Sequence, residues 1–314
     1  MTGFTVDPWD PGYAAALAVE ALSELGTTSA ELILDVEHPA ADWKPVRPGP
    51  GVDAPDTLLV ADGVRRIDAR VWVSDADAPM PLPGIAASFA AGIVRCGPGG
   101  ADLAAIEVGR SLISASPYAP EVKTAHAVYR PGRAADSSME ELSLALQRQV
   151  TQLEVDLAVR HRAGTSDLLL VDGPLRGRTH LPNTVGYIKT HHTAYLPPPQ
   201  SAVVSALAPG ERTPVFLMGT SWRRHAWYVR LPVRSSTPWA GIARCEASAE
   251  LEPAQVTRLA DELTLALPPL AGVDYKDPRA PQNLVPIGGL EKLLRHHLGD
   301  PRLLYRALRT ASQE

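Results

Sequence analysis

Cysteine is almost absent from this chain of 314 residues, which carries only Cys96 and Cys245. The two lie far apart and fit no metal-ligand or redox spacing, so we expect buried or idle thiols in a reducing cytoplasm. No apolar run approaches the roughly 18 residues that a membrane span requires, and the first residues lack the basic and apolar regions of a signal peptide. These absences argue against a disulfide scaffold and a membrane protein, and they predict a cytoplasmic protein with no membrane partner.

The sequence also lacks a nucleotide-phosphate loop and a Gly-x-Ser-x-Gly elbow, so nothing in it supports kinase, ATPase or esterase chemistry. Lysine is scarce, with five lysines against 25 arginines. That bias suits phosphate recognition or follows from codon usage. The net charge of −5 argues against a protein that coats nucleic acid. It leaves room for a nuclease, because a local basic groove matters more than the sum of charges.

The composition is that of a globular protein, and a mass of 33.5 kDa suffices for one large domain or two small ones. Residues 1 to about 40 are expected to form one or two helices, "PGYAAALAVEALSELG" and "SAELILDVE". A Pro/Gly-rich connector, "HPAADWKPVRPGPGVDAPD", follows them. We therefore assign residues 1–54 to a helical extension with its linker and residues 55–314 to the main domain.

The first half of the main domain is rich in strand patterns. "TLLVADG" predicts a short apolar strand that ends at Asp62-Gly63, and "RRIDARVWVSD" alternates with the period of a half-buried strand. Further strands are expected in "GIAASFAAGIVRC", "ADLAAIEVGRSLISAS" and "EVKTAHAVYR". Four or five strands in a row with short breaks indicate an antiparallel meander.

The second half begins with a long helix. "DSSMEELSLALQRQVTQLEVDLAVRHR" opens on a capping box, Ser137 to Glu140 or Ser138 to Glu141, and keeps helical period for about seven turns. Its leucine and valine stripe has Glu154 at the edge. "SDLLLVDG" then reads as a strand buried on both faces. Further strands are predicted at "TPVFLMG", "AWYVRLPV" and "GIARCEAS", and helices at 253–266, 288–298 and 302–310.

Two aspartates at predicted strand ends and a glutamate on the helix between them are the main candidates for chemistry: Asp62, Glu154 and Asp172. Three converging carboxylates cannot all stay ionised without a cation, because like charges raise one another's pKa. Hard divalent ions supply that compensation and can activate water for phosphodiester cleavage. Each acid also has a simpler interpretation. Both aspartates precede glycine, as in a turn, and Glu154 can be a solvated helix charge.

The segment "LEVDLAVRHRAGTSDLLLVDGPLRGR", followed by "VGYIKTHHTAYL", resembles the core signature of the NurA nuclease family. Members show a "VDGS"-like strand end, a helix with Leu-Glu-x-x-x-Ala, a "DGxL" strand end and then a Gly-x-x-Lys segment. The matching positions are Asp62 in "VADGVRR", Glu154 in "LEVDLA", Asp172 in "VDGPL" and Lys189 in "GYIK". The resemblance spans residues 55–300, and its distinctive part is 150–196.

The resemblance implies a ribonuclease H-like fold, Mn²⁺ or Mg²⁺ as cofactor, and exonuclease and endonuclease activity on DNA. It also implies a homodimer that works with the hexameric DNA translocase HerA in processing double-strand breaks. The metal would be held by Asp62, Glu154 and Asp172. Lys189 would contact the scissile phosphate, and a surface lysine is its simpler interpretation.

This sequence departs from the family pattern at two places. The first motif reads "ADGVRR", where the family has a serine or threonine after the glycine. Members also close with a Tyr-Pro-rich segment and an Ala-His pair that helps hold the metal. Here Tyr275 and Asn283 echo the first part, but no histidine falls at the matching point. His296 would serve only in a different helix register, and a solvated helix face is its simpler interpretation.

Other basic side chains are weaker candidates. His191 and His192 are adjacent, so on a helix at most one of them could face a site as a phosphate or metal neighbour. "SWRRHAWYVR" mixes basic and aromatic residues, which suits stacking and phosphate contacts along a single strand or an ordinary strand pair. The candidate DNA contacts are Arg65, Arg176, Arg178, Arg223 and Arg224. Glu107 lies in an apolar strand, and its alternation places it on the outer face.

The sequence thus predicts one α/β domain of ribonuclease H-like type, a mixed sheet flanked by helices with helical terminal extensions. The predicted reaction is metal-dependent hydrolysis of DNA. A catalytically inactive NurA-like subunit that binds a ring ATPase is the competing hypothesis, which the missing histidine favours and the three matched acids oppose. An unrelated hydrolase with the same type of sheet is a third interpretation, because a fold does not fix a function.

Overall fold

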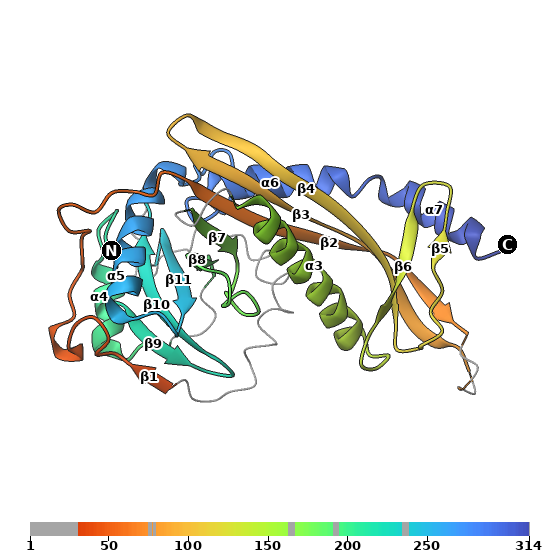
Figure 1. Ribbon diagram of the computed structural model, residues 1–314, viewed down its shortest axis with the longest axis horizontal. Coiled ribbons are helices and arrows are strands. Elements are labelled where there is room, and N and C mark those ends of the chain that lie inside the picture. Colours follow the sequence, from red (N-terminus) through yellow and green to blue (C-terminus); the bar gives the residue numbers. More distant parts are fainter. Residues whose placement is uncertain are drawn as a thin grey trace, which may run out of the picture. The chain divides into compact units, whose positions relative to one another are not determined.

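A computed structural model describes residues 31–74, 77, 80–162, 167–190, 195–233 and 239–313 of the protein (Figure 1). The chain divides into two compact units. The first unit comprises Met1–Val60, Arg95–Asp102 and Arg162–Gly288, and the second comprises Ala61–Val94, Leu103–His161 and Gly289–Glu314. Within the described ranges, no helix is both long enough and apolar enough to cross a membrane.

The first unit is built on a mixed sheet with the strand order β1-β9-β10-β11-β8-β7. Its strands are β1 (Glu31–Ile33), β7 (Leu168–Asp172), β8 (Thr184–Ile188), β9 (Phe216–Gly219), β10 (Arg223–Arg230) and β11 (Ile242–Ser248). β7 and β8 pair in parallel, and every other neighbouring pair in this order is antiparallel. The parallel pair brings the carboxyl ends of β7 and β8 to the same edge of the sheet.

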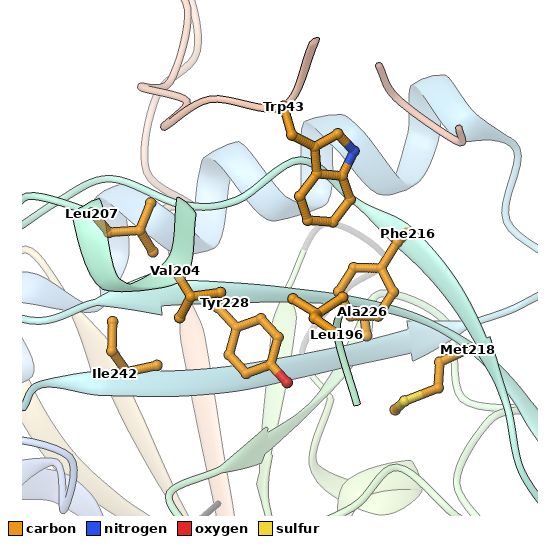
Figure 2. Packing of buried hydrophobic residues seen from close by; sticks show 9 residues of the cluster. All are labelled: Trp43, Leu196, Val204, Leu207, Phe216, Met218, Ala226, Tyr228 and Ile242. Carbon is orange, nitrogen blue, oxygen red and sulfur yellow. The ribbon is translucent and has the colours of Figure 1, made fainter. Parts of the chain in front are cut away.

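Helices and a large apolar cluster cover this sheet. The helices are η1 (Ala40–Asp42), α4 (Pro198–Ala206), α5 (Pro253–Ala266) and η2 (Pro268–Leu270). Figure 2 shows the cluster, in which Trp43 from the N-terminal segment packs over Phe216, with ring centroids 5.8 Å apart. Tyr228 of β10 stacks on the same phenylalanine at 6.2 Å. The cluster therefore joins the N-terminal segment to β9 and β10 of the sheet.

The second unit contributes strands in the order β2-β3-β4-β6-β5 to the mixed sheet. The strands are β2 (Leu58–Val73), β3 (Leu82–Gly97), β4 (Gly100–Ser114), β5 (Val122–Lys123) and β6 (Val128–Arg133), and the helices are α3 (Met139–His161), α6 (Val285–His297) and α7 (Pro301–Ala311). These bounds include a few residues of β2, β3, β4 and α6 that belong to the first unit. β4 pairs with β6 in parallel, and β5 pairs with β6 antiparallel.

Helices pack on both faces of these strands. Ile85 and Ala87 of β3 lie in one cluster with Leu146 of α3, whereas Ala86 between them lies in another with Leu308 of α7. Side chains alternate along a strand, so helices on both faces favour apolar residues on both sides of β3. This burial explains the run "GIAASFAAGIV", in which the one polar residue, Ser88, donates a hydrogen bond to Asp68. It confirms the predicted α/β class with a mixed sheet flanked by helices.

Several predicted elements are confirmed. The long helix is α3, and Ser138 caps it by accepting a hydrogen bond on Oγ from the Glu141 backbone nitrogen at 3.2 Å. The helix predicted at 253–266 is α5, with the same bounds, and the two C-terminal helices are α6 and α7. The sequence reasoning missed α4, whose proline-rich start reads as a loop. The predicted helix "PGYAAALAVEALSELG" lies outside the described residues.

Three local predictions are wrong. "SAELILDVE" holds the strand β1, paired with β9, instead of a helix, because the sheet edge supplies the partners for its backbone. β2 runs without a break through Asp62 and Gly63, so that dipeptide is not a turn. The strands β4 and β6 are parallel, so these strands do not form a purely antiparallel meander.

Gly186 of β8 is required by the turn that follows β7. A Cβ atom at this position would lie 2.6 Å from the Leu175 backbone nitrogen and 2.9 Å from the Gly173 carbonyl oxygen. Both atoms belong to backbone, which cannot rotate away as a side chain can. The glycine of "GYIK" therefore allows the "DGPL" turn to lie directly on β8.

We predict that Gly186→Ala destabilises the first unit by about 1–3 kcal/mol, because the added methyl group overpacks two backbone atoms. Urea denaturation followed by circular dichroism measures the change. Gly49→Ala is the matched control in the same unit, since a Cβ atom there meets nothing within 4 Å. An equal loss in both variants would show that the close approach at Gly186 is energetically unimportant.

Candidate functional site

Asp172 and Lys189 meet where the two parallel strands of the first unit end. Asp172 is the last residue of β7 and pairs in register with Tyr187 of β8. Because side chains alternate along a strand, Lys189 emerges on the same face as Tyr187, next to the acid. Its Nζ donates a hydrogen bond to Asp172 Oδ2 at 2.7 Å. The lysine is only 8% exposed, so this ion pair is largely shielded from water.

A hydrogen-bonded chain continues from Lys189 into the segment before α6. Lys189 Nζ also donates to Asn283 Oδ1 at 3.0 Å, and Asn283 Nδ2 donates to Asp277 Oδ2 at 2.6 Å. Arg279 pairs with the same Asp277 carboxylate at 3.2 Å. Asn283 is 1% exposed. The structure therefore brings together Asp172, Lys189 and Asn283, three residues that the sequence had singled out separately.

The pKa of Asp277 lies below its ordinary value. Burial alone would raise it, but hydrogen bonds from the Arg279 side chain and backbone and from the Asn283 amide outweigh the burial. Each of these donors favours the ionised carboxylate. At neutral pH the chain of contacts therefore ends in a negative charge that accepts from Asn283.

A second buried ionic cluster lies beneath the turn that follows Asp172. Glu246 of β11 is fully buried, and its Oε1 accepts from Arg224 Nε at 2.8 Å and from Arg244 Nη2 at 3.1 Å. Its other oxygen accepts from the Leu175 backbone nitrogen at 3.3 Å. The sequence reasoning missed Glu246. Its signal was an Arg-x-Glu pair inside the apolar strand "GIARCEAS", where alternation puts both charges on one face.

In the second unit, Asp62 and Glu154 both contact Gly63. Asp62 Oδ1 accepts from the Gly63 backbone nitrogen at 2.7 Å. The Glu154 carboxylate of α3 lies so close that a Cβ atom on Gly63 would be 2.4 Å from its Oε1. Both acids are buried, at 7% and 5% exposed. Glu154 is therefore not a solvated helix charge, and two acids distant in the sequence lie at one residue of β2.

The donor chemistry of the predicted metal ligands fits a hard cation, because all of the donors are carboxylate oxygens. Asp62 and Glu154 belong to the second unit and Asp172 to the first. Among the described residues, no group of three or more His, Cys, Asp or Glu side chains is placed to hold a metal ion. The joint role of the three acids stays a prediction.

The candidate DNA-binding arginines differ in exposure. Arg176 and Arg223 are exposed, and Arg65 is half-buried. Arg178 is buried and donates from Nη1 to the Pro174 carbonyl at 3.0 Å, so it braces the "DGPL" turn. Arg224 is fully buried against Glu246, with its guanidinium 4.5 Å from the centre of the Trp222 ring. Arg178 and Arg224 thus have structural partners, whereas Arg176 and Arg223 face solvent.

The remaining candidates are exposed or lie outside the described residues. His191 and His192 are not among the described residues. Tyr275 is 82% exposed, and His296 is exposed on α6. Glu107 is exposed, as its alternation predicted, and it pairs with Arg160.

Cys96 and Cys245 are free, buried thiols, as expected from their spacing. Burial, with a smaller contribution from Asp102, raises the pKa of Cys96 to about 11. Burial likewise raises the pKa of Cys245. Both thiols therefore stay protonated and unreactive at neutral pH.

Comparisons with known proteins show that this chain is similar to solved structures. No protein-family profile and no curated protein sequence matches the chain. It is similar to the NurA nuclease from Sulfolobus solfataricus, with a TM-score of 0.46, 13% identity, and coverage of 91% of this chain and 90% of that one. It is also similar to endonuclease V from Bacillus subtilis, with a TM-score of 0.35, 11% identity, and coverage of 95% and 94%. The assignment of a function therefore depends on the chain's own residues and contacts.

We predict that Glu246→Gln costs about 3–5 kcal/mol of stability, because it removes the buried charge that Arg224 and Arg244 both contact. Urea denaturation measures the loss. Glu262→Gln is the control, since it breaks an ion pair with Arg258 on the surface of α5 and should leave the midpoint nearly unchanged. Similar midpoints for the two variants would contradict a structural role for Glu246.

The lowered pKa of Asp277 gives a second prediction. A carboxyl group that holds its proton less tightly in the folded state stabilises the fold above its ordinary pKa of 3.8, and this contribution is lost as the pH falls through the lowered value. We expect the Asp277 side chain to titrate below 3.8 in a carbon-detected NMR titration. A midpoint at or above that value would show that its contacts with Arg279 and Asn283 do not persist in solution.

Proposed function

We propose that this protein is a metal-dependent nuclease that hydrolyses phosphodiester bonds in DNA. The observation that carries the proposal is the buried pair of Asp172 and Lys189 at the ends of two parallel strands. It joins an acid that can hold a cation to an ammonium group that can stabilise a phosphate. Those two residues are also the ones that match the "DGxL" and Gly-x-x-Lys parts of the NurA-like sequence pattern.

The proposed cofactor is Mn²⁺ or Mg²⁺, which would be held by Asp62, Glu154 and Asp172. Such an ion, when bound, lowers the pKa of water and neutralises charge on the phosphate. Carboxylates suit it because hard cations prefer oxygen ligands. Two of these proposed ligands, Asp62 and Glu154, both lie against Gly63 of β2.

The chain's own residues would bind and orient the DNA. Lys189, held at Asp172, would stabilise the negative charge that develops on the phosphate during hydrolysis. Arg176 and Arg223 face solvent and would contact backbone phosphates along the strand. Arg65 is a further candidate for such a contact. Arg178 and Arg224 would act indirectly, by bracing the turn that follows Asp172.

We further propose a homodimer and a HerA-type hexameric ATPase as partner, in the processing of DNA ends at double-strand breaks. This part of the proposal follows from the sequence resemblance alone. Size-exclusion chromatography with multi-angle light scattering measures the oligomeric state of the purified protein, and a monomer at micromolar concentration would contradict the dimer.

We predict that the purified protein cleaves end-labelled linear DNA with Mn²⁺ or Mg²⁺ and not with chelator. Asp172→Asn and Glu154→Gln should each lower the rate by at least about 100-fold, because each removes a charge from the reacting centre. The change is measured on denaturing gels at matched protein concentration. Asp156→Asn is the control, since this acid lies exposed on the same helix as Glu154 and should cleave at the wild-type rate.

Cleavage by Asp172→Asn at the wild-type rate would contradict the assignment of that residue. No cleavage by wild type under any metal would favour the non-catalytic subunit. The melting temperature measured with and without Mn²⁺ then separates a nuclease from a non-catalytic subunit. A site for Mn²⁺ raises it by mass action, and the rise should be absent from Glu154→Gln.

A further inference from the structure

We propose that Asn283 is a positioning residue, which holds the Lys189 ammonium at Asp172 through an amide whose orientation is set by Asp277. The inference rests on the proposed function, because it names the group that orients the residue expected to meet the phosphate. Three hydrogen bonds in series carry it. They join Asp172 to Lys189 at 2.7 Å, Lys189 to Asn283 at 3.0 Å and Asn283 to Asp277 at 2.6 Å.

The orientation of the Asn283 amide is determined by its two partners. An ammonium only donates hydrogen bonds and an ionised carboxylate only accepts them. Rotation of the amide by half a turn would therefore aim its NH₂ group at Lys189 and its oxygen at Asp277, and both contacts would be repulsive. Arg279 keeps Asp277 ionised by pairing with it, so the carboxylate stays an acceptor. Asp277 thus decides which end of the amide faces Lys189.

The backbone of Asn283 is held separately from its side chain. Its nitrogen donates to the Arg279 carbonyl at 2.9 Å, and the neighbouring Gln282 carbonyl accepts from Tyr187 Oη at 2.8 Å. The Asn283 carbonyl lies against Gly272, where a Cβ atom would come within 2.4 Å of it. Tyr187 belongs to β8, the strand that Lys189 follows. The backbone next to Asn283 is therefore held by Tyr187 of β8, the strand that leads to the lysine that the Asn283 side chain contacts.

Lysine needs such a contact because its ammonium sits on a flexible four-carbon stem. The hydrogen bond to Asp172 alone would fix only the direction of the ammonium from that acid, whereas the hydrogen bonds to Asp172 and Asn283 together define the position of the ammonium. A misplacement of a catalytic group by about 1 Å can lower a rate about 100-fold. We therefore expect loss of the Asn283 amide to affect the chemical step more than the binding of DNA.

The experiment exchanges the amide of Asn283 with the carboxylate of Asp277. Asn283→Leu removes the amide at similar volume. Asn283→Asp sets two carboxylates against each other. The double variant Asn283→Asp with Asp277→Asn restores a donor facing an acceptor, with the acid now next to Lys189. Asp277→Asn alone, on a partly exposed residue, serves as the mild variant in case Asn283→Leu fails to fold.

Two readouts are taken on each variant. The first is the reactivity of Lys189 towards trace acetic anhydride, measured by mass spectrometry relative to exposed Lys123. The second is kcat and KM on linear duplex DNA with Mn²⁺. We expect Asn283→Leu and Asn283→Asp to change the ratio of Lys189 labelling to Lys123 labelling at least about threefold. Both variants should also lower kcat about 10- to 100-fold with KM nearly constant. The double variant should return both to within about threefold of wild type. Asp277→Asn should lie between wild type and Asn283→Leu.

A Lys189 ratio that is unchanged in folded Asn283→Leu would overturn the inference, as would a double variant no better than Asn283→Asp. If Asn283→Leu does not fold, an unchanged ratio in Asp277→Asn overturns it instead. Failure of the proposed function is distinguishable, because wild type would then show no cleavage while the labelling ratio still reports on the Asn283 contact.

Discussion

The first unit depends on the pairing of buried charges. Arg212 is fully buried between Glu37 and Asp261, with contacts of 2.7 Å to each. Arg224 and Arg244 share Glu246, and Lys189 is held by Asp172. A buried charge that loses its partner costs several kcal/mol, so each of these charges requires its partner to be in place. The N-terminal segment, the strand ends and α5 are joined in this way.

The same constraint shapes the neighbourhood of Asp172. The "DGPL" turn lies on β8 because Gly186 has no side chain. The backbone of the turn is hydrogen-bonded to Glu246 at the Leu175 nitrogen and to Arg178 at the Pro174 carbonyl. Lys189 is then left to contact Asp172 and Asn283 on the opposite face of β8. A strand end fixed in this manner is preorganised, and preorganised charge is what the hydrolysis of a phosphodiester requires. The nuclease proposal is consistent with that arrangement.

The sequence predicted the elements whose signal lies within the element itself. α3 and α5 follow from a capping serine or a helical stripe, and β3 and β4 follow from apolar runs. It misjudged Asp62-Gly63, because Asp-Gly has a strong local preference for turns, and in β2 strand pairing overrides that preference. It misjudged β1 for a similar reason: three residues, Glu31–Ile33, are too few to show a period, and pairing with β9 makes them a strand.

The sequence by itself determined the α/β class, the long helix and the short motifs that single out Asp62, Glu154, Asp172 and Lys189. Only the tertiary structure decided which of these residues meet. Asn283 and Asp277 are about 90 residues from Lys189 along the chain, and a pattern with a period of two or 3.6 residues carries no information over that distance. The Arg-x-Glu spacing placed Arg244 and Glu246 on one face of their strand, but only the tertiary structure added Arg224 and the Leu175 backbone to that pair.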